Sequence, residues 1–490
     1  MEPRQMLAAD LMIGLNPTNN ELTITDTGTV DNELLIQPGS PGTTTITATG
    51  GGMFDAGSLA LSGLTGGALS MGDTVLTFDT MPVDLVTIDG ADGDDMLSAA
   101  GIGPSSFGLT FIGGNGTDSY NLTGATLVGL NPDGMEGANL DGETLTLGGG
   151  SNVAATFDGD ATSMIITSGG GSSLGDSGGT DGFNTEGTIL HNGGSLSLND
   201  SNGAILGSST TIASGILNSS NQVNLSSGDV LTGAGFVGSD VQLNSGTISG
   251  TLTFNPGAQI DGDFGSGGGT VTPAGTGVGS IAALDLLELD SGDSLDIDIE
   301  GVAGAGVAGG HDQVVVAGDG SVDLGGATLN LSSTATALSV PAGTELTIIN
   351  SASTTGQFAG LPEGAVVMLN GQAFTISYVA GMSGNDVSLT AVSPPTVAIT
   401  SDTTGDATGD FLLTFTFSDP VDGFVAGDVT LSGGTAGAFT GVDGATVFTL
   451  VVTPPAGSVT DITVDVAEGC LLYTSPSPRD QRGSRMPSSA

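Results

Sequence analysis

The feature that most constrains this chain is a repeated pattern of short runs in which apolar residues alternate with threonine, serine or asparagine. Examples are Glu21–Asp26, Thr144–Leu147, Gln222–Leu225 and Thr251–Phe254, and glycine-rich turns separate such runs along the chain. Alternation with a period of two is typical of β-strands that bury one face. Strands this short suit a coil whose stacked turns each contribute two or three of them. The sequence therefore predicts an all-β fold, built mainly as a parallel β-helix or solenoid.

Composition narrows the classes of partner. The chain of 490 residues carries 53 Asp+Glu against 4 Lys+Arg, a formal net charge of −49. No basic face is available to meet phosphates, which excludes nucleic acid and anionic membrane surfaces as partners. No stretch of apolar residues is long enough to span a bilayer, so we expect no membrane insertion within the chain. The mean hydropathy of +0.24 argues against general disorder.

The last 21 residues, 470–490, differ from the rest of the chain. They read CLLYTSPSPRDQRGSRMPSSA and hold the only cysteine together with three of the four arginines. Read back into DNA, CLLYTSPSPRD and SRMPSSA resemble two parts of a transposon-type sequencing adapter, in one frame and separated by the length of a sample index. The alternative is a genuine tail rich in serine and proline. We interpret residues 470–490 as adapter-derived and exclude them from fold reasoning.

Residues 1–11 read MEPRQMLAADL and resemble the LEPR-type signature near the N-terminus of giant exported proteins of planctomycete-type bacteria. Met1 and Met6 depart from that pattern, and the alternative is an accidental start. The resemblance implies an exported protein, extracellular or at the cell surface. We interpret the chain as a fragment open at both ends. The matching residues are Glu2, Pro3, Arg4, Leu7, Ala9 and Asp10.

Two turns within residues 12–140, which we predict to be β-solenoid, carry the residues of a calcium site. Gly113–Asn121 fits the G-G-x-G-x-D-x-U-x repeat of calcium-binding β-rolls, and Gly90–Ser98 fits it with Ala91 in place of a glycine. Glycines let carbonyl oxygens converge, and aspartate supplies a hard oxygen ligand. The two copies lie about one turn of a coil apart, so they can stack but cannot form an extended ion array. The alternative is a set of Asp-Gly corners without metal. The candidate ligands are Asp92, Asp94, Asp95, Asn115 and Asp118.

The next segments divide into β-helix rungs at 141–265, a flexible linker at 266–280 and a module at 281–392. Runs such as Gly187–Gly194 and Leu231–Gly238 resemble the passenger β-helices of autotransporter-type proteins. Residues 281–392, with HDQVVV from His311 and FAGLPEG from Phe358, resemble the terminal passenger module of those proteins. Such modules are structural, so the resemblance implies no catalytic residue.

Residues 393–469 contain longer runs, among them Phe411–Phe417 and Val447–Val452. The phrase FSDPV from Phe417, followed by Phe424 and by VDVA from Val464, resembles a bacterial Ig-like module. We therefore expect the solenoid to be followed by a truncated Ig-like β-sandwich.

These observations predict a non-catalytic structural or adhesin-like protein, secreted or at the cell surface, with calcium as a candidate stabilising ion. Its expected partners are surface polysaccharide or other cell-surface proteins. The alternative is a carbohydrate-active β-helix enzyme that acts on polysaccharide. Lyases of that class need Arg or Lys, which the body of the chain lacks beyond Arg4, and His191 and His311 have no catalytic companions nearby in the sequence. We therefore expect no enzyme activity.

Overall fold

The computed structural model describes residues 10–473 except 29–30, 50–51, 103–106, 114–117, 128, 132–137, 141–143, 149, 154–156, 160–162, 176–182, 263–267, 336–337, 383, 394, 405–406, 458–460 and 467–471. Of the signature at 1–11, only Asp10 and Leu11 are described, and of the adapter-like residues 470–490, only Leu472 and Tyr473. Strands dominate the described chain, which confirms the all-β prediction.

Residues 11–392, called the ladder region below, consist mainly of parallel ladders, in which strands pair with strands from neighbouring turns of the chain. In the most regular part each turn contributes three strands, one to each of three faces. On the first face the strands pair in parallel in chain order. They are β3 (Glu33–Pro38), β8 (Met96–Ala100), β10 (Ser119–Thr123), β14 (Thr144–Gly148), β17 (Met164–Ser168), the first parts of β20 (Thr188–Leu198) and β22 (Ser209–Ser219), β24 (Val230–Gly233), β27 (Thr247–Gly250), β30 (Thr270–Pro273), β32 (Ser294–Asp298) and β34 (Thr328–Ser332).

The other two faces follow the same rule. The second face holds β11 (Thr126–Leu127), β15 (Asn152–Val153), β18 (Gly171–Leu174), the last parts of β20 and β22, β25 (Phe236–Val237), β28 (Thr253–Phe254) and the first part of β31 (Ser280–Glu288). The third face holds β13 (Ala138–Leu140), β16 (Phe157–Gly159), β19 (Phe183–Thr185), β21 (Ala204–Leu206), β23 (Gln222–Leu225), β26 (Asp240–Leu243), β29 (Gln259–Gly262), the last parts of β31 and of β33 (Gln313–Asp323), and β36 (Ser353–Thr355).

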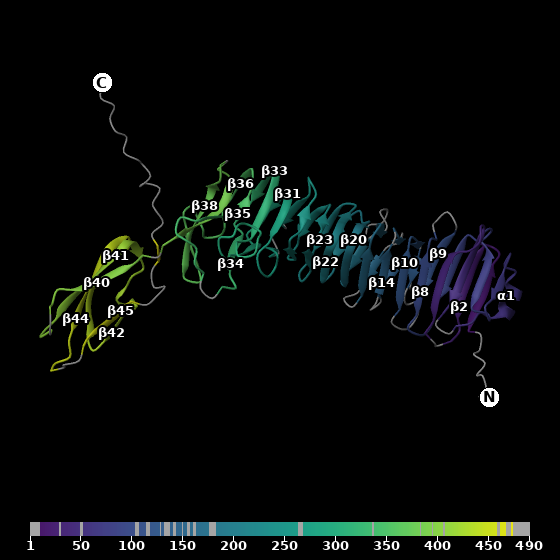
Figure 1. Ribbon diagram of the computed structural model, residues 1–490, viewed down its shortest axis with the longest axis horizontal. Helices are drawn as coiled ribbons and strands as arrows, with labels where there is room; N and C mark the ends of the chain where they lie inside the picture. The colour runs from purple at the N-terminus through teal and green to yellow at the C-terminus, as the bar shows by residue number, and fades with distance from the viewer. Residues whose placement is uncertain are drawn as a thin grey trace, which may run out of the picture.

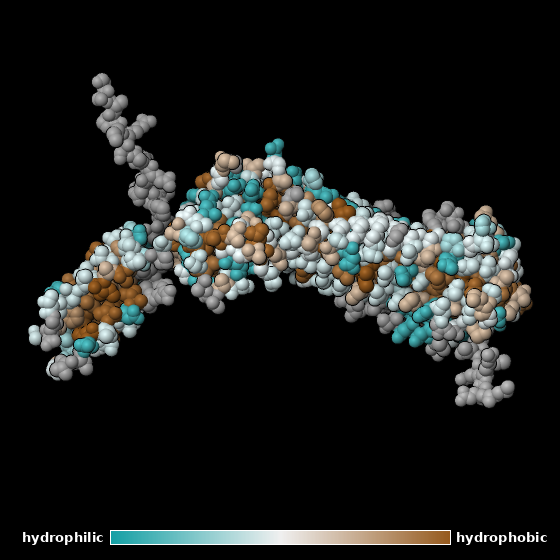
Figure 2. All heavy atoms as spheres, viewed as in Figure 1, coloured by the Kyte–Doolittle hydropathy of each residue, from teal (hydrophilic) through white to brown (hydrophobic). Residues whose placement is uncertain are grey.

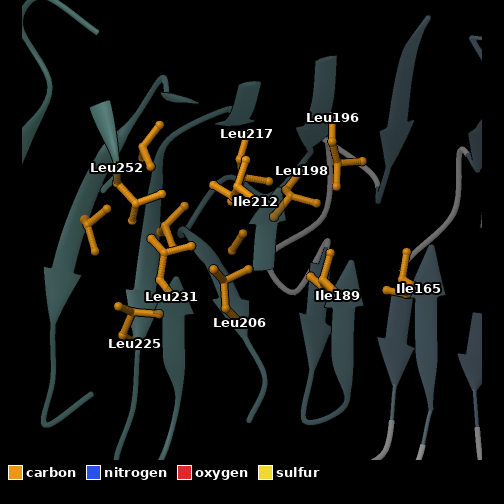
Figure 3. Packing of buried hydrophobic residues seen from close by; sticks show 14 of the residues in the cluster. Ile165, Ile189, Leu196, Leu198, Leu206, Ile212, Leu217, Leu225, Leu231 and Leu252 are labelled. Atoms are coloured by element: carbon orange, nitrogen blue, oxygen red, sulfur yellow. The ribbon is translucent and has the colours of Figure 1, made fainter. Parts of the chain in front are cut away.

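The interior of the ladder region is filled by columns of apolar side chains in register. Leu145, Ile165 and Ile189 follow one another on the first face, and Leu196 and Leu217 do so on the second. Figure 3 shows such side chains pointing into the space between the faces. One continuous cluster of buried residues runs from Leu11 to Ala391. Because alternate residues of each strand point inward, the short alternating runs of the sequence are sufficient to build this core.

The N-terminal end of the ladder region departs from parallel pairing. Two antiparallel arrangements occur there, one between β1 and β2 and one along β3, β4, β6 and β5, while β2 continues in parallel into β7, β9 and β12. The additional strands are β1 (Leu11–Asn16), β2 (Glu21–Asp26), β4 (Thr43–Ala48), β5 (Ala68–Ser70), β6 (Val75–Asp79), β7 (Leu85–Asp89), β9 (Gly108–Ile112) and β12 (Gly129–Asn131).

A short helix, α1 (Ala56–Ser62), covers the free edge of β1. The Asp55 carboxylate accepts the Ser58 N–H at 2.5 Å, and Gly63 ends the helix in the left-handed conformation at φ 72°. The edge N–H of Ile13 donates to Ser58 Oγ at 2.9 Å, and that of Leu11 donates to the Met53 carbonyl at 3.1 Å. An unpaired strand edge invites pairing with another chain, and these contacts remove that opportunity.

The C-terminal end of the ladder region is also closed by antiparallel strands, which are β35 (Glu345–Asn350), β37 (Val366–Leu369), β38 (Gln372–Ala380) and β39 (Asp386–Val392). The sequence predicts a flexible linker at 266–280, and the structure describes residues 268–280 of it as part of the ladder region. Strand β30 lies within them and pairs with β27 and β32, and Val271 is buried in the common core. The glycine and threonine content of this segment suggested a linker, but the alternation around Val271 is that of one more strand of the first face.

A second, separate core lies in residues 397–473, called the C-terminal region below. Four antiparallel strands run in the order β40–β41–β44–β43, and the pair β42–β45 forms a smaller sheet. Figure 1 shows the C-terminal region beyond one end of the elongated ladder region, and α1 at the other end. Figure 2 shows a broad apolar area on the C-terminal region, whereas the ladder region shows smaller, scattered ones. The elements are β40 (Val397–Ser401), β41 (Phe411–Asp422), η1 (Ala426–Asp428), β42 (Val429–Ser432), β43 (Thr435–Thr440), β44 (Ala445–Thr453), β45 (Thr463–Val466) and β46 (Leu472–Tyr473), which pairs with β41.

Candidate functional site

The two aspartates that close the predicted calcium turns, Asp95 and Asp118, lie one above the other at the corner that leads into the first face. They are 23 positions apart in the sequence, and Asp118 Oδ1 accepts the backbone N–H of Asp95 at 2.8 Å. Asp95 Oδ1 in turn accepts the backbone N–H of Asn32, on the neighbouring turn, at 2.7 Å. The structure therefore brings the two turns into contact, and each carboxylate joins its own turn to the one before it.

The remaining candidate ligands lie elsewhere in these turns. Asp92 and Asp94 are exposed, and the Asp94 N–H donates to Asp31 Oδ1 at 3.0 Å. Asn115 lies outside the described residues. The structure thus joins Asp95 with Asp118 inside the corner, while Asp92 and Asp94 face solvent at its outer side.

The second oxygens of the buried pair point back into their own turns. Asp95 and Asp118 are 2% and 0% exposed, and their Oδ2 atoms have no hydrogen-bond partner among the described residues. A Cβ on Gly90 would overlap Asp95 Oδ2 and would lie 2.8 Å from the Gly113 carbonyl oxygen, and a Cβ on Gly113 would overlap Asp118 Oδ2. Glycine is required at both positions because the carboxylate occupies the space of a side chain.

Burial controls the electrostatics of this corner. The pKa of Asp95 is raised to about 7, mainly by burial and in smaller part by the nearby carboxylates of Asp118 and Asp26, while the Asn32 N–H opposes the change. The pKa of Asp118 is also raised, mainly by burial. A cation or a proton at the Oδ2 atoms would relieve the repulsion between these stacked acids.

The same arrangement recurs at other corners. Asp293 Oδ1 accepts the N–H of Gly269, 24 positions earlier, at 2.8 Å, and Asp200 Oδ2 accepts that of Phe183 at 2.9 Å. Asp312 accepts the N–H groups of Gly279 and Asp298, Asp386 accepts that of Ser351, and Ser239 accepts that of Ser219. Sequence reasoning missed this role, although Gly90–Asp95, Gly113–Asp118 and Gly381–Asp386 share a spacing of five residues that could have indicated it.

Both histidines are interior groups. His191 is 1% exposed, and its Nδ1 lies 2.6 Å from Thr167 Oγ1 on the neighbouring strand of the first face. His311 is 5% exposed, and its Nε2 lies 3.1 Å from the Thr347 carbonyl oxygen. Burial lowers the pKa of each imidazole. These contacts are those of side chains that pack between rungs.

Across the part of the chain that the structure describes, no group of three or more His, Cys, Asp or Glu side chains is arranged to hold a metal ion. Calcium takes six to eight oxygen ligands, and of the predicted ligands the structure joins Asp95 with Asp118. No described helix has the length and apolar character needed to cross a bilayer.

One comparison with known proteins bears on the C-terminal region. Residues 391–472 match the model of a bacterial Ig-like domain. No curated protein matches the chain. The match confirms the Ig-like module predicted for residues 393–469, and domains of this family are typical of surface proteins. The resemblances to planctomycete-type and autotransporter proteins remain predictions.

Proposed function

We propose that this chain is a non-catalytic structural element of a bacterial cell surface or its surroundings, in which a parallel β-helix holds an Ig-like domain at one end. The observation that carries the proposal is the unbroken core from Leu11 to Ala391, built by in-register stacking and joined to a region that matches an Ig-like family. A long body of this kind exposes extended faces, which suits adhesion to surface polysaccharide or to other cell-surface proteins.

The alternative, an enzyme acting on polysaccharide, has no specific support in the described residues. His191 and His311 are both buried, and each is held by contacts between rungs. Acid–base catalysis requires a group that reaches the substrate.

Incubation of the purified chain with neutral and acidic polysaccharides separates the two readings. Cosedimentation reports binding, while reducing-end release and ultraviolet absorbance report hydrolysis and lyase activity. We expect binding without turnover. Turnover that persists through purification and is lost on His191→Gln or His311→Gln would contradict the non-catalytic assignment.

We further propose that calcium stabilises the corner at Asp95 and Asp118. The support is the pair of buried carboxylates, whose Oδ2 atoms have no hydrogen-bond partner among the described residues, beside the Gly113 carbonyl. An ion that binds only the folded state raises its free energy of unfolding. Low calcium inside a cell and millimolar calcium outside would then couple folding to export.

Thermal unfolding in EDTA, in millimolar calcium and in magnesium at matched ionic strength tests this role. We expect calcium alone to raise the unfolding temperature of the ladder region, and Asp95→Ala or Asp118→Ala to abolish the rise. Asp319→Ala, an exposed acid on β33, is the matched control and should keep the full response. Equal shifts with both ions would mean charge screening, and no shift would remove calcium from the proposal.

A further inference from the structure

A hollow of about 280 Å³ lies on the outer side of the first face, across β3, β8 and β10. It exists because the outward residues of β8 at this level, Ser98 and Ala100, are small. Register places Ser98 between Leu35 and Asn121, which form opposite sides. The lining residues are Glu33, Leu34, Leu35, Thr49, Met96, Ser98, Ala99, Ala100, Asn121 and Thr123.

The floor and one side of the hollow are apolar. Leu35 is half-buried there, and Met96 is 41% exposed beside it. None of the described residues that line the hollow is aromatic, so they offer no platform on which a sugar ring would stack. An unbranched alkyl chain fits these surfaces better than a rigid ring, because it can follow a narrow apolar floor.

One end of the hollow carries a positioned negative charge. The Glu33 carboxylate is exposed, and Thr49 Oγ1 donates to its Oε2 at 2.8 Å. That contact leaves Oε1 available and holds the carboxylate beside the apolar floor. An alkyl chain on this floor would therefore end next to a carboxylate, which is the environment that a terminal ammonium group requires.

The chain itself offers no such group. It contains no lysine, and its four arginines, at positions 4, 479, 482 and 485, fall outside the described residues. The net charge of −49 attracts cationic partners to the whole surface, and the hollow would select among them by shape.

We propose that the hollow over β3, β8 and β10 binds a lysine side chain from a basic segment of a partner protein. The aliphatic stem lies on Leu35 and Met96 beside Ser98, and the ammonium group pairs with Glu33. This inference rests on the proposed adhesive role and gives it a partner chemistry. It is independent of calcium at Asp95 and Asp118, so each can fail alone.

Fluorescence anisotropy with three labelled peptides of equal length tests the proposal. One carries lysines, one carries Nε-acetyl-lysines with the same stem and no charge, and one carries diaminopropionic acids with the charge and almost no stem. We expect the lysine peptide to bind most tightly and high salt to weaken it. Equal binding of the lysine and diaminopropionic peptides would overturn the proposal, because charge alone would then be recognised.

Four variants locate the binding. Glu33→Gln removes the charge and keeps an acceptor for Thr49, while Ser98→Leu and Ala100→Leu fill the hollow without altering charge. Glu345→Gln removes an equally exposed carboxylate on β35 and is the charge-matched control. We expect a loss of about three- to fivefold for Glu33→Gln and at least that for the filling variants, with no change for Glu345→Gln. Equal losses for Glu33→Gln and Glu345→Gln would overturn the assignment.

Two further readouts keep the result interpretable. Thermal unfolding should be unchanged in all four variants, since every altered side chain points outward. A chitosan oligosaccharide supplies ammonium groups on sugar rings. If it binds more tightly than the lysine peptide and loses that binding in Ser98→Leu, the partner is a cationic glycan and the protein assignment is wrong.

Discussion

The ladder region and the C-terminal region solve the same problem, the burial of apolar strand faces, with different side chains. In the ladder region most inward positions are Leu, Ile or Val, each stacked on its counterpart in the next turn. In the C-terminal region the core centres on Phe424. The centroid of its ring lies 5.0 to 5.6 Å from the ring centroids of Phe415, Phe417, Phe439 and Phe448.

The difference follows from geometry. Turns of a coil lie one strand spacing apart, so short aliphatic side chains already touch those above and below. Two packed sheets lie about 10 Å apart, a gap that larger rings fill. The ladder core therefore depends on many equivalent local contacts, whereas the Ig-like core depends on one residue that joins several strands. The effect of a core substitution should therefore stay within neighbouring turns of the ladder region, whereas in the C-terminal region it should spread to the whole domain.

The largest effect should come from Phe424→Ala. It removes the ring that four other phenylalanines contact, and we expect the free energy of unfolding of the C-terminal region to fall by about 3–5 kcal/mol. Calorimetry should show this region unfolding earlier while the ladder transition stays in place. Val425→Ala, at a neighbouring side chain that is 54% exposed, should change little. A parallel shift of both transitions would show that the two cores are coupled.

Removal of one corner acceptor should have a smaller, local effect. Asp118→Ala leaves the buried Asp95 N–H without its acceptor, which we expect to cost about 1–3 kcal/mol. Asp118→Asn keeps an acceptor oxygen and should be close to the original chain when both are measured in EDTA. Hydrogen exchange at Asp95 and in β8 and β10 should rise in the alanine variant only. Equal losses in both variants would mean that the charge, and not the hydrogen bond, is what stabilises the corner.

The smallest effect should be a dependence on pH confined to the ladder region. Burial raises the pKa of Asp312 to about 7, with smaller contributions from Asp298 and Glu300, while the N–H groups of Asp298 and Gly279 oppose it. The folded chain thus holds this proton more tightly than the unfolded chain does. Its contribution is complete below pH about 4 and is lost as the pH rises towards 7.

Unfolding temperatures measured from pH 8 to pH 5 should therefore rise for the ladder transition. Asp312→Asn should reduce this rise without abolishing it, because Asp95, whose pKa is also raised to about 7, contributes in the same direction. The lowered pKa values of His191 and His311 act in the opposite direction below pH about 6.5. His191→Gln and His311→Gln should accordingly steepen the rise on acidification. An unchanged slope in Asp312→Asn would show that this carboxyl does not carry the effect.

Much of the strand pattern could be read from alternation alone. The runs Glu21–Asp26 and Gln222–Leu225 coincide with β2 and β23, whereas only the second half of Thr251–Phe254 is a strand. Alternation indicates which side of a strand is buried. In stacked turns this burial pattern is the main feature by which the sequence defines each strand. The same signal cannot distinguish parallel from antiparallel neighbours, so it gave no indication of the antiparallel ends.

Two features needed information that alternation does not carry. Helix α1 is only seven residues long, too short for a periodic pattern, although Asp55 and Gly63 have the identities of its two caps. The corner aspartates also accept an N–H from the neighbouring turn, a role that the calcium-turn pattern does not indicate. Which oxygen faces the backbone depends on how turns stack, and that is a property of the assembled coil.

The register that stacks these turns also sets distance. Thr188 and Ser209 occupy equivalent places on neighbouring turns, so a whole turn of chain advances the structure by a single strand spacing of about 4.8 Å. Helix α1 and the β1 edge contacts close one end of the ladder region, and β35 to β39 close the other. The length of the ladder region is therefore set by the number of turns in the sequence. Inserting or deleting one complete turn would change the distance between α1 and the Ig-like domain by one strand spacing. The contacts that close the two ends of the ladder region would stay the same.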